Sequence, residues 1–110
     1  MKVKSDREII KMFNNVLDEY GFECASITLG ENGIERVYND YTCFEDMRLQ
    51  IVTNNKGAYV TLFELEKPIF NDRLSVEIMR LYYNDGVAFE MLMEIVISTV
   101  DSYLEGDYDE

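Results

Sequence analysis

Acidic side chains supply most of the groups in this 110-residue chain that could carry chemistry. Asp40, Glu45 and Asp46 lie close together in the sequence, and carboxylates in such a group can bind Mg²⁺ or act as an acid–base pair. Adjacent acidic residues are also common on loops that precede strands, so this pattern is a weak signal. A carboxylate-dependent enzyme is therefore the third of our functional hypotheses, and we predict no metal ligand and no cofactor.

Histidine is absent, which excludes Ser-His-Asp catalysis, Cys-His catalysis and zinc sites that contain histidine. The chain also lacks a Walker A sequence, a GxGxxG sequence and the EF-hand pattern. Cys24 and Cys43 have acidic neighbours, whereas a reactive thiol needs a cationic one, so we interpret both as small core residues. These absences favour a binding protein over an enzyme.

The formal net charge is −12, from 22 acidic and 10 basic residues. A charge of this sign disfavours binding to nucleic acid and to anionic membranes, and it favours basic protein surfaces as partners. No stretch reaches the length of a membrane span, and the N-terminal residues lack the apolar segment of a signal peptide. We therefore expect a cytoplasmic protein. An acidity that serves only solubility is the simplest alternative.

The acidic residues near the C-terminus are arranged more regularly than solubility requires. No Lys or Arg follows Arg80. At 100° per residue, four acidic residues of the last predicted helix fall within an arc of roughly 60° and span about 22 Å; they are Glu90, Glu94, Asp101 and Glu105. Helix faces usually mix charges of both signs, because pairs of like charge four residues apart are destabilising. A solvated helix face is the plain explanation, and a functional acidic stripe is the alternative.

In the functional interpretation, the acidic stripe imitates nucleic acid. Carboxylates one helical turn apart, about 6 Å, approximate every second phosphate of a DNA strand, where phosphates follow every ~3.4 Å. Tyrosines lie among the acidic residues, and arginine can stack on tyrosine while it pairs with a carboxylate. The predicted partner-binding residues are Glu90, Glu94, Asp101, Glu105, Tyr82, Tyr83, Asp85, Asp40 and Tyr41.

In size and charge the chain resembles small phage and mobile-element proteins that block host nucleases, such as anti-CRISPR and anti-restriction proteins. The resemblance rests on composition over the whole chain, and it implies an inhibitor that occupies the nucleic-acid channel of a defence nuclease. The second hypothesis is a cytosolic adaptor or chaperone without mimicry. Type III secretion chaperones are similarly small, acidic and usually dimeric, so a homodimer is included here. These chaperones carry an additional helix between their strands. In this chain, only residues 69–84 could form such a helix.

Two helices and four strands are predicted from the pattern of apolar residues. Ser5 and Glu8 form a capping box that begins a helix over 5–20, with Gly21 at its end. Its apolar face consists of Ile9, Phe13, Val16, Leu17 and Tyr20, and its polar face of Lys11, Asn14, Asn15 and Asp18. Strands are expected over 22–29, 34–38, 47–53 and 58–66, with turns at 30–33 and 54–57 and a stop at Pro68.

Residues 69–84 fit both a helical and a strand pattern, and their β-branched and aromatic residues favour a strand over 74–83. A second helix is predicted over 87–104, with Asp85 as its N-cap and a core stripe of Phe89, Leu92, Val96, Val100 and Tyr103. Residues 106–110 form a frayed tail. The sequence thus predicts one α+β domain over 1–110, in which an antiparallel sheet of four or five strands is flanked by an N-terminal and a C-terminal helix.

Overall fold

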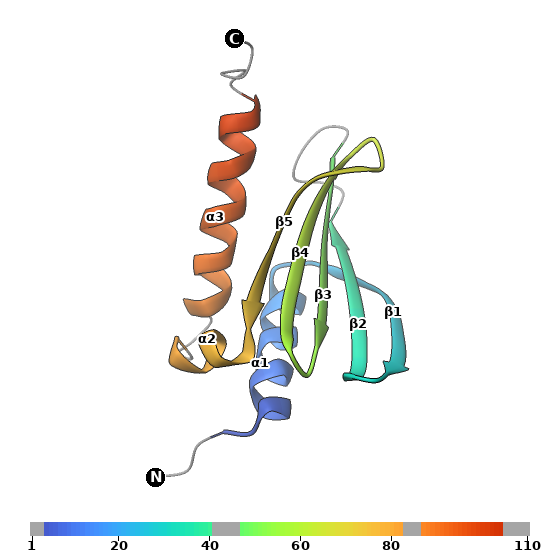
Figure 1. Ribbon diagram of the computed structural model, residues 1–110, viewed down its shortest axis with the longest axis vertical. Helices are drawn as coiled ribbons and strands as arrows, with labels where there is room; N and C mark the ends of the chain where they lie inside the picture. The colour runs from blue at the N-terminus through green and yellow to red at the C-terminus, as the bar shows by residue number, and fades with distance from the viewer. Residues whose placement is uncertain (1–3, 41–46, 83–86, 105–110) are drawn as a thin grey trace.

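A computed structural model of the chain describes residues 4–40, 47–82 and 87–104, and the side chains of residues 40, 47, 96, 97 and 99–104 are outside this description. The fold is α+β, as predicted, with a single five-stranded antiparallel sheet of order β1-β2-β3-β4-β5 (Figure 1). The elements in chain order are α1 Asp6–Glu19, β1 Glu23–Gly30, β2 Gly33–Asp40, β3 Met47–Asn54, β4 Gly57–Glu64, β5 Lys67–Ser75, α2 Val76–Leu81 and α3 Val87–Leu104.

Helix α1 begins at the predicted capping box. The Glu8 N–H donates to Ser5 Oγ at 3.2 Å, and the Ser5 N–H donates to Glu8 Oε1 at 2.8 Å. The buried face is rotated from the predicted one toward Ile10 and Asn14, whereas Tyr20 is exposed. Asn14 was expected on the polar face and is instead buried, because its Oδ1 accepts a hydrogen bond from Thr53 Oγ1 of β3 at 2.8 Å.

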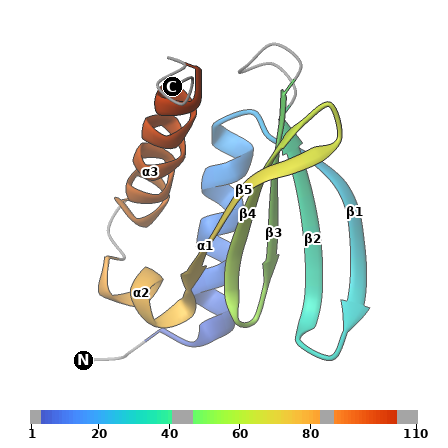
Figure 2. The ribbon, with the colours of Figure 1, turned by 45° about the horizontal axis from the view of Figure 1, so that its top comes forward.

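The centre of the sheet carries most of the core. In β3, Leu49 and Ile51 are fully buried on the predicted face, and in β4 Val60 and Leu62 are buried opposite them. Two-residue turns connect β1 to β2 and β3 to β4 within the predicted segments 30–33 and 54–57. Helix α1 lies against one face of the sheet. Helix α3 lies beside the sheet, next to its β5 edge (Figures 1 and 2).

The prediction that Pro68 stops a strand is wrong. Strand β4 ends at Glu64, the chain turns at Leu65 and Glu66, and β5 begins at Lys67. Pro68 lies opposite Phe63, where the register shifts by one residue. A proline is tolerated here because β5 is an edge strand, and its missing N–H removes no ladder hydrogen bond from the centre of the sheet.

The predicted strand over 74–83 is also wrong. Strand β5 ends at Ser75, whose Oγ accepts from the Ile78 N–H at 3.3 Å and so begins the short helix α2. Val76 and Met79 then become buried one helical turn apart. Helix α2 follows the last strand, so it is not the helix between strands that the resemblance to type III secretion chaperones implies. The predicted bounds of α3 are confirmed, whereas the predicted cap at Asp85 and the tail over 106–110 lie outside the described residues.

Strand β1 differs from the other strands because every one of its residues is exposed. Ile27 is 60% exposed and Leu29 83% exposed. The expectation that Cys24 is a core residue is therefore wrong, since the outer edge of β1 has no neighbouring strand in the described sheet. Cys43 lies outside the described residues. Among the described helices, none combines the length and apolar character that crossing a membrane requires.

Candidate functional site

The acidic face of α3 is the predicted site that the structure describes best. Glu90 and Glu94 are exposed and lie one helical turn apart. Phe89 and Leu92 of the predicted core stripe are buried, together with Ala88, but Val87 and Ile95 are 37% and 43% exposed, so the exposed side of the helix carries apolar as well as acidic side chains. Asp101 belongs to α3, but its side chain is outside the description, and Glu105 lies outside the described residues altogether.

An aromatic cluster holds the first half of α3 in place. The Phe89 ring is 5.6 Å from the Phe13 ring, 4.5 Å from the Tyr20 ring and 6.1 Å from the Phe22 ring, measured between centroids. Phe13 belongs to α1, and Tyr20 directly follows it. The Phe89 side chain therefore packs α3 against α1. Glu90 and Glu94 of the same helix are exposed.

Basic residues near this end of the chain do not neutralise the acidic face. Residues 81–110 hold 8 Asp and Glu and no Lys or Arg. The last arginine, Arg80, pairs with Asp6 and donates to the Lys4 carbonyl, and Arg48 makes a bidentate pair with Glu66 at 2.9 and 3.3 Å. Arg48 also lies 4.0 Å above the Phe63 ring. Neither of the two described ion pairs involves Glu90 or Glu94.

The structure does not gather the remaining predicted residues into the same site. Tyr82 caps the C-terminal end of α2 and is 46% exposed. Asp40 ends β2, and β3, β4 and β5 separate that strand from the side of the sheet where α3 lies. Tyr41, Tyr83 and Asp85 are outside the described residues.

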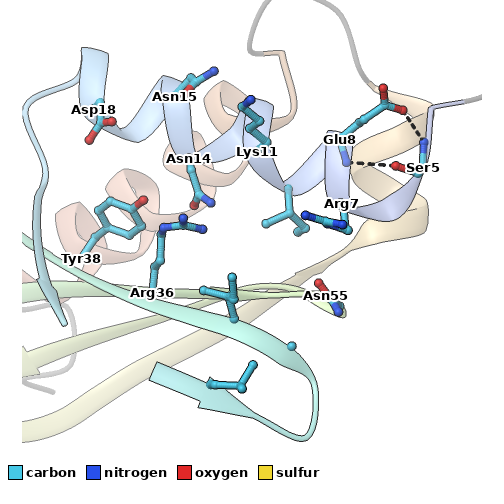
Figure 3. A pocket seen from close by; sticks show the side chains of 14 residues that line it. Ser5, Arg7, Glu8, Lys11, Asn14, Asn15, Asp18, Arg36, Tyr38 and Asn55 are labelled. Carbon is cyan, nitrogen blue, oxygen red and sulfur yellow. Dashed lines mark hydrogen bonds between the residues drawn. The ribbon is translucent and has the colours of Figure 1, made fainter. Parts of the chain in front are cut away.

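A groove of about 950 Å³ opens between α1 and the β1–β2 hairpin, and the sequence did not predict it (Figure 3). Its polar lining includes Arg7 and Lys11 from α1 and Arg36 from β2. Arg36 and Tyr38 are two positions apart in β2 and both face α1. Burial raises the pKa of the Tyr38 hydroxyl to about 12, with smaller contributions from Cys24 and Asp18, while Arg36 opposes the shift. The signal that could have revealed the groove was the pair Arg7 and Lys11, one helical turn apart.

Metal-dependent chemistry receives no support from the described part of the chain. Within residues 4–40, 47–82 and 87–104, no group of three Cys, Asp or Glu side chains could hold a metal ion. Glu45 and Asp46 lie outside these ranges. The pKa of Glu8 is lowered, chiefly by its hydrogen bond from the Ser5 backbone, so this carboxylate stays ionised in the capping box. No family model, no curated protein and no solved structure matches the chain.

Proposed function

We propose that this chain is a protein-interaction domain that binds a basic surface of a partner protein through the acidic face of α3. The basic surface is a nucleic-acid-binding one, as in the channel of a defence nuclease, and the chain acts as an inhibitor by occupying it. The observation that carries the proposal is the exposure of Glu90 and Glu94 on a helix whose opposite side is anchored in the core.

The energetics of α3 support a role for its charge. A pair of like charges four residues apart destabilises a helix by about 0.2–0.5 kcal/mol, and an exposed lysine at either position would remove that penalty. Because no basic side chain follows Arg80, the negative potential along α3 is not screened from within this segment. Complementary potentials accelerate association and select partners more than they add affinity, which suits an inhibitor that competes with nucleic acid.

A second candidate function is an adaptor that binds a partner without mimicry, and strand β1 favours it. The outer edge of β1 has no neighbour in the described sheet, and Ile27 and Leu29 are exposed on it. A long exposed edge strand can accept a strand from another chain. Binding of this kind depends on main-chain hydrogen bonds and apolar contacts, so salt has little effect on it.

Charge reversal with a matched control tests the first candidate. Proteins captured from a lysate of the source organism by the wild-type chain are compared with those captured by Glu90→Lys/Glu94→Lys and by Glu23→Lys/Glu31→Lys. The control pair is exposed, lies on and beside β1, and changes the net charge equally. We expect the α3 variant to lose the partner, the control to keep it, and duplex DNA to compete with the chain for it.

Two outcomes would contradict the proposal. Equal losses in both variants would show that only total charge matters. Capture that survives the α3 reversal and high salt but is lost with Ile27→Lys would assign the interaction to β1 and favour the adaptor.

A further inference from the structure

The two edges of the sheet differ in how they are protected against pairing with a further strand. In β5, Pro68 lacks an N–H, the register shifts beside it, and α3 lies next to the strand (Figure 2). Lys67, Asp72 and Arg73 add charges to the same strand. Prolines, bulges, charged side chains and covering helices are the features that keep an edge strand from pairing with another chain. The β5 edge is therefore protected in several ways at once.

Strand β1, at the other edge, has none of these protections over its last five residues. The segment Ser26–Gly30 contains no proline and no charged residue. The register shift of this strand lies before the segment, between Cys24 and Ser26. Every residue of β1 is exposed, and the described sheet has no strand beyond it. The outer N–H and C=O groups of this segment are therefore open to pairing with another strand.

Apolar side chains gather beside this free edge. Ile27 is 60% exposed and Leu29 83% exposed, and Ile34, which lies opposite Leu29 in β2, is 46% exposed. Side chains two positions apart in a strand share a face, so Ile27 and Leu29 lie on the same side of the sheet. The three residues together expose on the order of 300–400 Å² of apolar surface, comparable to the largest apolar patches of ordinary monomers, which often serve in binding.

The segment Ser26–Gly30 is complementary to a second copy of itself. Consider a two-fold axis that passes through Thr28 and is perpendicular to the sheet, so that the two β1 strands are antiparallel. Ile27 then lies opposite Leu29 of the second copy, and this contact occurs twice. The two Thr28 side chains meet on the other face. Aliphatic and Thr–Thr pairs across strands stabilise a sheet, and this register leaves the bulge before Ser26 outside the pair.

Net charge opposes the association of two copies, and the position of β1 limits this cost. Each copy has a formal charge of −12. Helix α3, with Glu90 and Glu94, lies next to β5, and four strand spacings separate β5 from β1 (Figure 1). At about 4.8 Å per spacing this is roughly 19 Å, about twice the distance over which physiological salt screens exposed charges. Pairing at β1 therefore keeps the acidic faces of the two copies apart.

We propose that β1 pairs with β1 of a second copy across this two-fold axis, so that two five-stranded sheets join into one. The pair buries on the order of 1,000 Å² in total, at the low end of specific interfaces, so the dimer is weak, with a Kd on the order of 10–100 µM. The dimer carries one acidic face of α3 at each outer side of the joined sheet. The proposal does not rest on the function proposed for α3.

Sedimentation equilibrium of the full chain, over a range of about 1–500 µM, tests the dimer. We expect the average mass to rise from that of one chain toward that of two. Leu29→Lys places a charge in the strand pair and should weaken the dimer at least about tenfold. Leu65→Lys is the matched control, because Leu65 lies in the β4–β5 turn and is 75% exposed, and it should leave the Kd unchanged. Both leucines are exposed, so both variants should fold.

A cysteine crosslink tests the register of the pair. In a chain whose Cys24 and Cys43 are replaced by serine, Thr28→Cys places two thiols at the axis, where the Cβ atoms of opposite residues are about 4.5–5.5 Å apart. Oxidised glutathione should convert these thiols to a disulfide. Ser26→Cys is the control, because Ser26 lies opposite Gly30 and the two Ser26 residues are roughly 13 Å apart along the strands. We expect a covalent dimer only for Thr28→Cys.

The effect of salt separates this dimer from the binding proposed for α3. Salt screens the repulsion between two acidic copies, so the Kd of the dimer should fall as salt is added, whereas a partner held by opposite charge is released. A mass of one chain at every concentration would overturn the proposal and would leave the β1 edge to a strand of a different protein. Equal weakening by Leu29→Lys and Leu65→Lys would also overturn it, as would a crosslink through Ser26→Cys in place of Thr28→Cys. None of these results bears on α3.

Discussion

The two halves of the sheet differ in how they are packed. Strands β3 and β4 bury Leu49, Ile51, Val60 and Leu62 completely beneath the helices, whereas every residue of β1 is exposed. The β1–β2 hairpin is joined to the rest of the sheet by the pairing of β2 with β3 and, at its turn, by the Asn55 N–H, which donates to the Asn32 carbonyl at 3.0 Å. The core thus lies under one half of the sheet, and the features suited to binding lie outside it: the exposed edge of β1 and the acidic face of α3.

Substitution of two glycines with positive φ should give the largest difference in stability between the two halves of the sheet. Gly57 has φ +144°, and a Cβ there would lie 2.2 Å from the Leu74 carbonyl oxygen, whereas at Gly33 (φ +86°) it would meet the Asn55 side chain. Backbone in β5 cannot move aside, but a side chain can. We expect Gly57→Ala to lower the free energy of unfolding by more than about 3 kcal/mol and Gly33→Ala by roughly 1–2 kcal/mol. Urea denaturation measures both, and equal losses would contradict the contrast between the halves.

A pair of isoleucines provides the next test. Ile51 in β3 is fully buried and Ile27 in β1 is 60% exposed. Ile51→Ala should lower the free energy of unfolding by about 2–4 kcal/mol, because buried surface is lost and a cavity remains. Ile27→Ala should change the free energy of unfolding by no more than about 0.5 kcal/mol. A large loss for Ile27→Ala in the monomer would show that β1 is packed against something.

The pH dependence of Tyr38 gives the smallest expected effect. Its pKa is raised to about 12 in the folded chain, from an ordinary value of 10.0, so the folded state holds the hydroxyl proton more tightly than the unfolded state. Stability is therefore lost as the pH rises from about 10 toward 12, by on the order of 2 kcal/mol. The Tyr38→Phe variant should not show this loss of stability, because phenylalanine has no hydroxyl to titrate. Urea denaturation of both chains between pH 9 and about 11.5 measures the difference, and parallel curves would contradict it.

Local signals predicted most of the fold. The Ser5–Glu8 box and the turns at 30–33 and 54–57 are each specified by a few neighbouring residues, and the structure confirms them. The β4–β5 turn was missed because Leu65 and Glu66 both adopt positive φ, which neither residue type favours. Helix α2 is too short for a periodic pattern, and only the Ser75 cap marked it.

The burial of Asn14 and the groove beside Arg36 depend on contacts between distant segments, so the sequence pattern did not predict them. Asn14 is polar and lies at a position that the helical pattern places outside the apolar face, but Thr53 from a distant strand pairs with it. Arg36 becomes part of a groove only because β2 passes beneath α1. The acidic face of α3 was predictable because its residues lie on one helix, whereas the groove joins residues from segments that no sequence pattern connects.

The salt dependence of partner affinity tests the central claim, that α3 binds a basic surface by charge, most directly. The Kd of the captured partner is measured by calorimetry over a series of salt concentrations, for the wild-type chain and for Glu90→Lys/Glu94→Lys. Exposed charges are screened within roughly 8–10 Å at physiological ionic strength. We predict that the wild-type affinity falls steeply with salt and that the variant does not bind. An affinity that is unchanged by salt would contradict the claim.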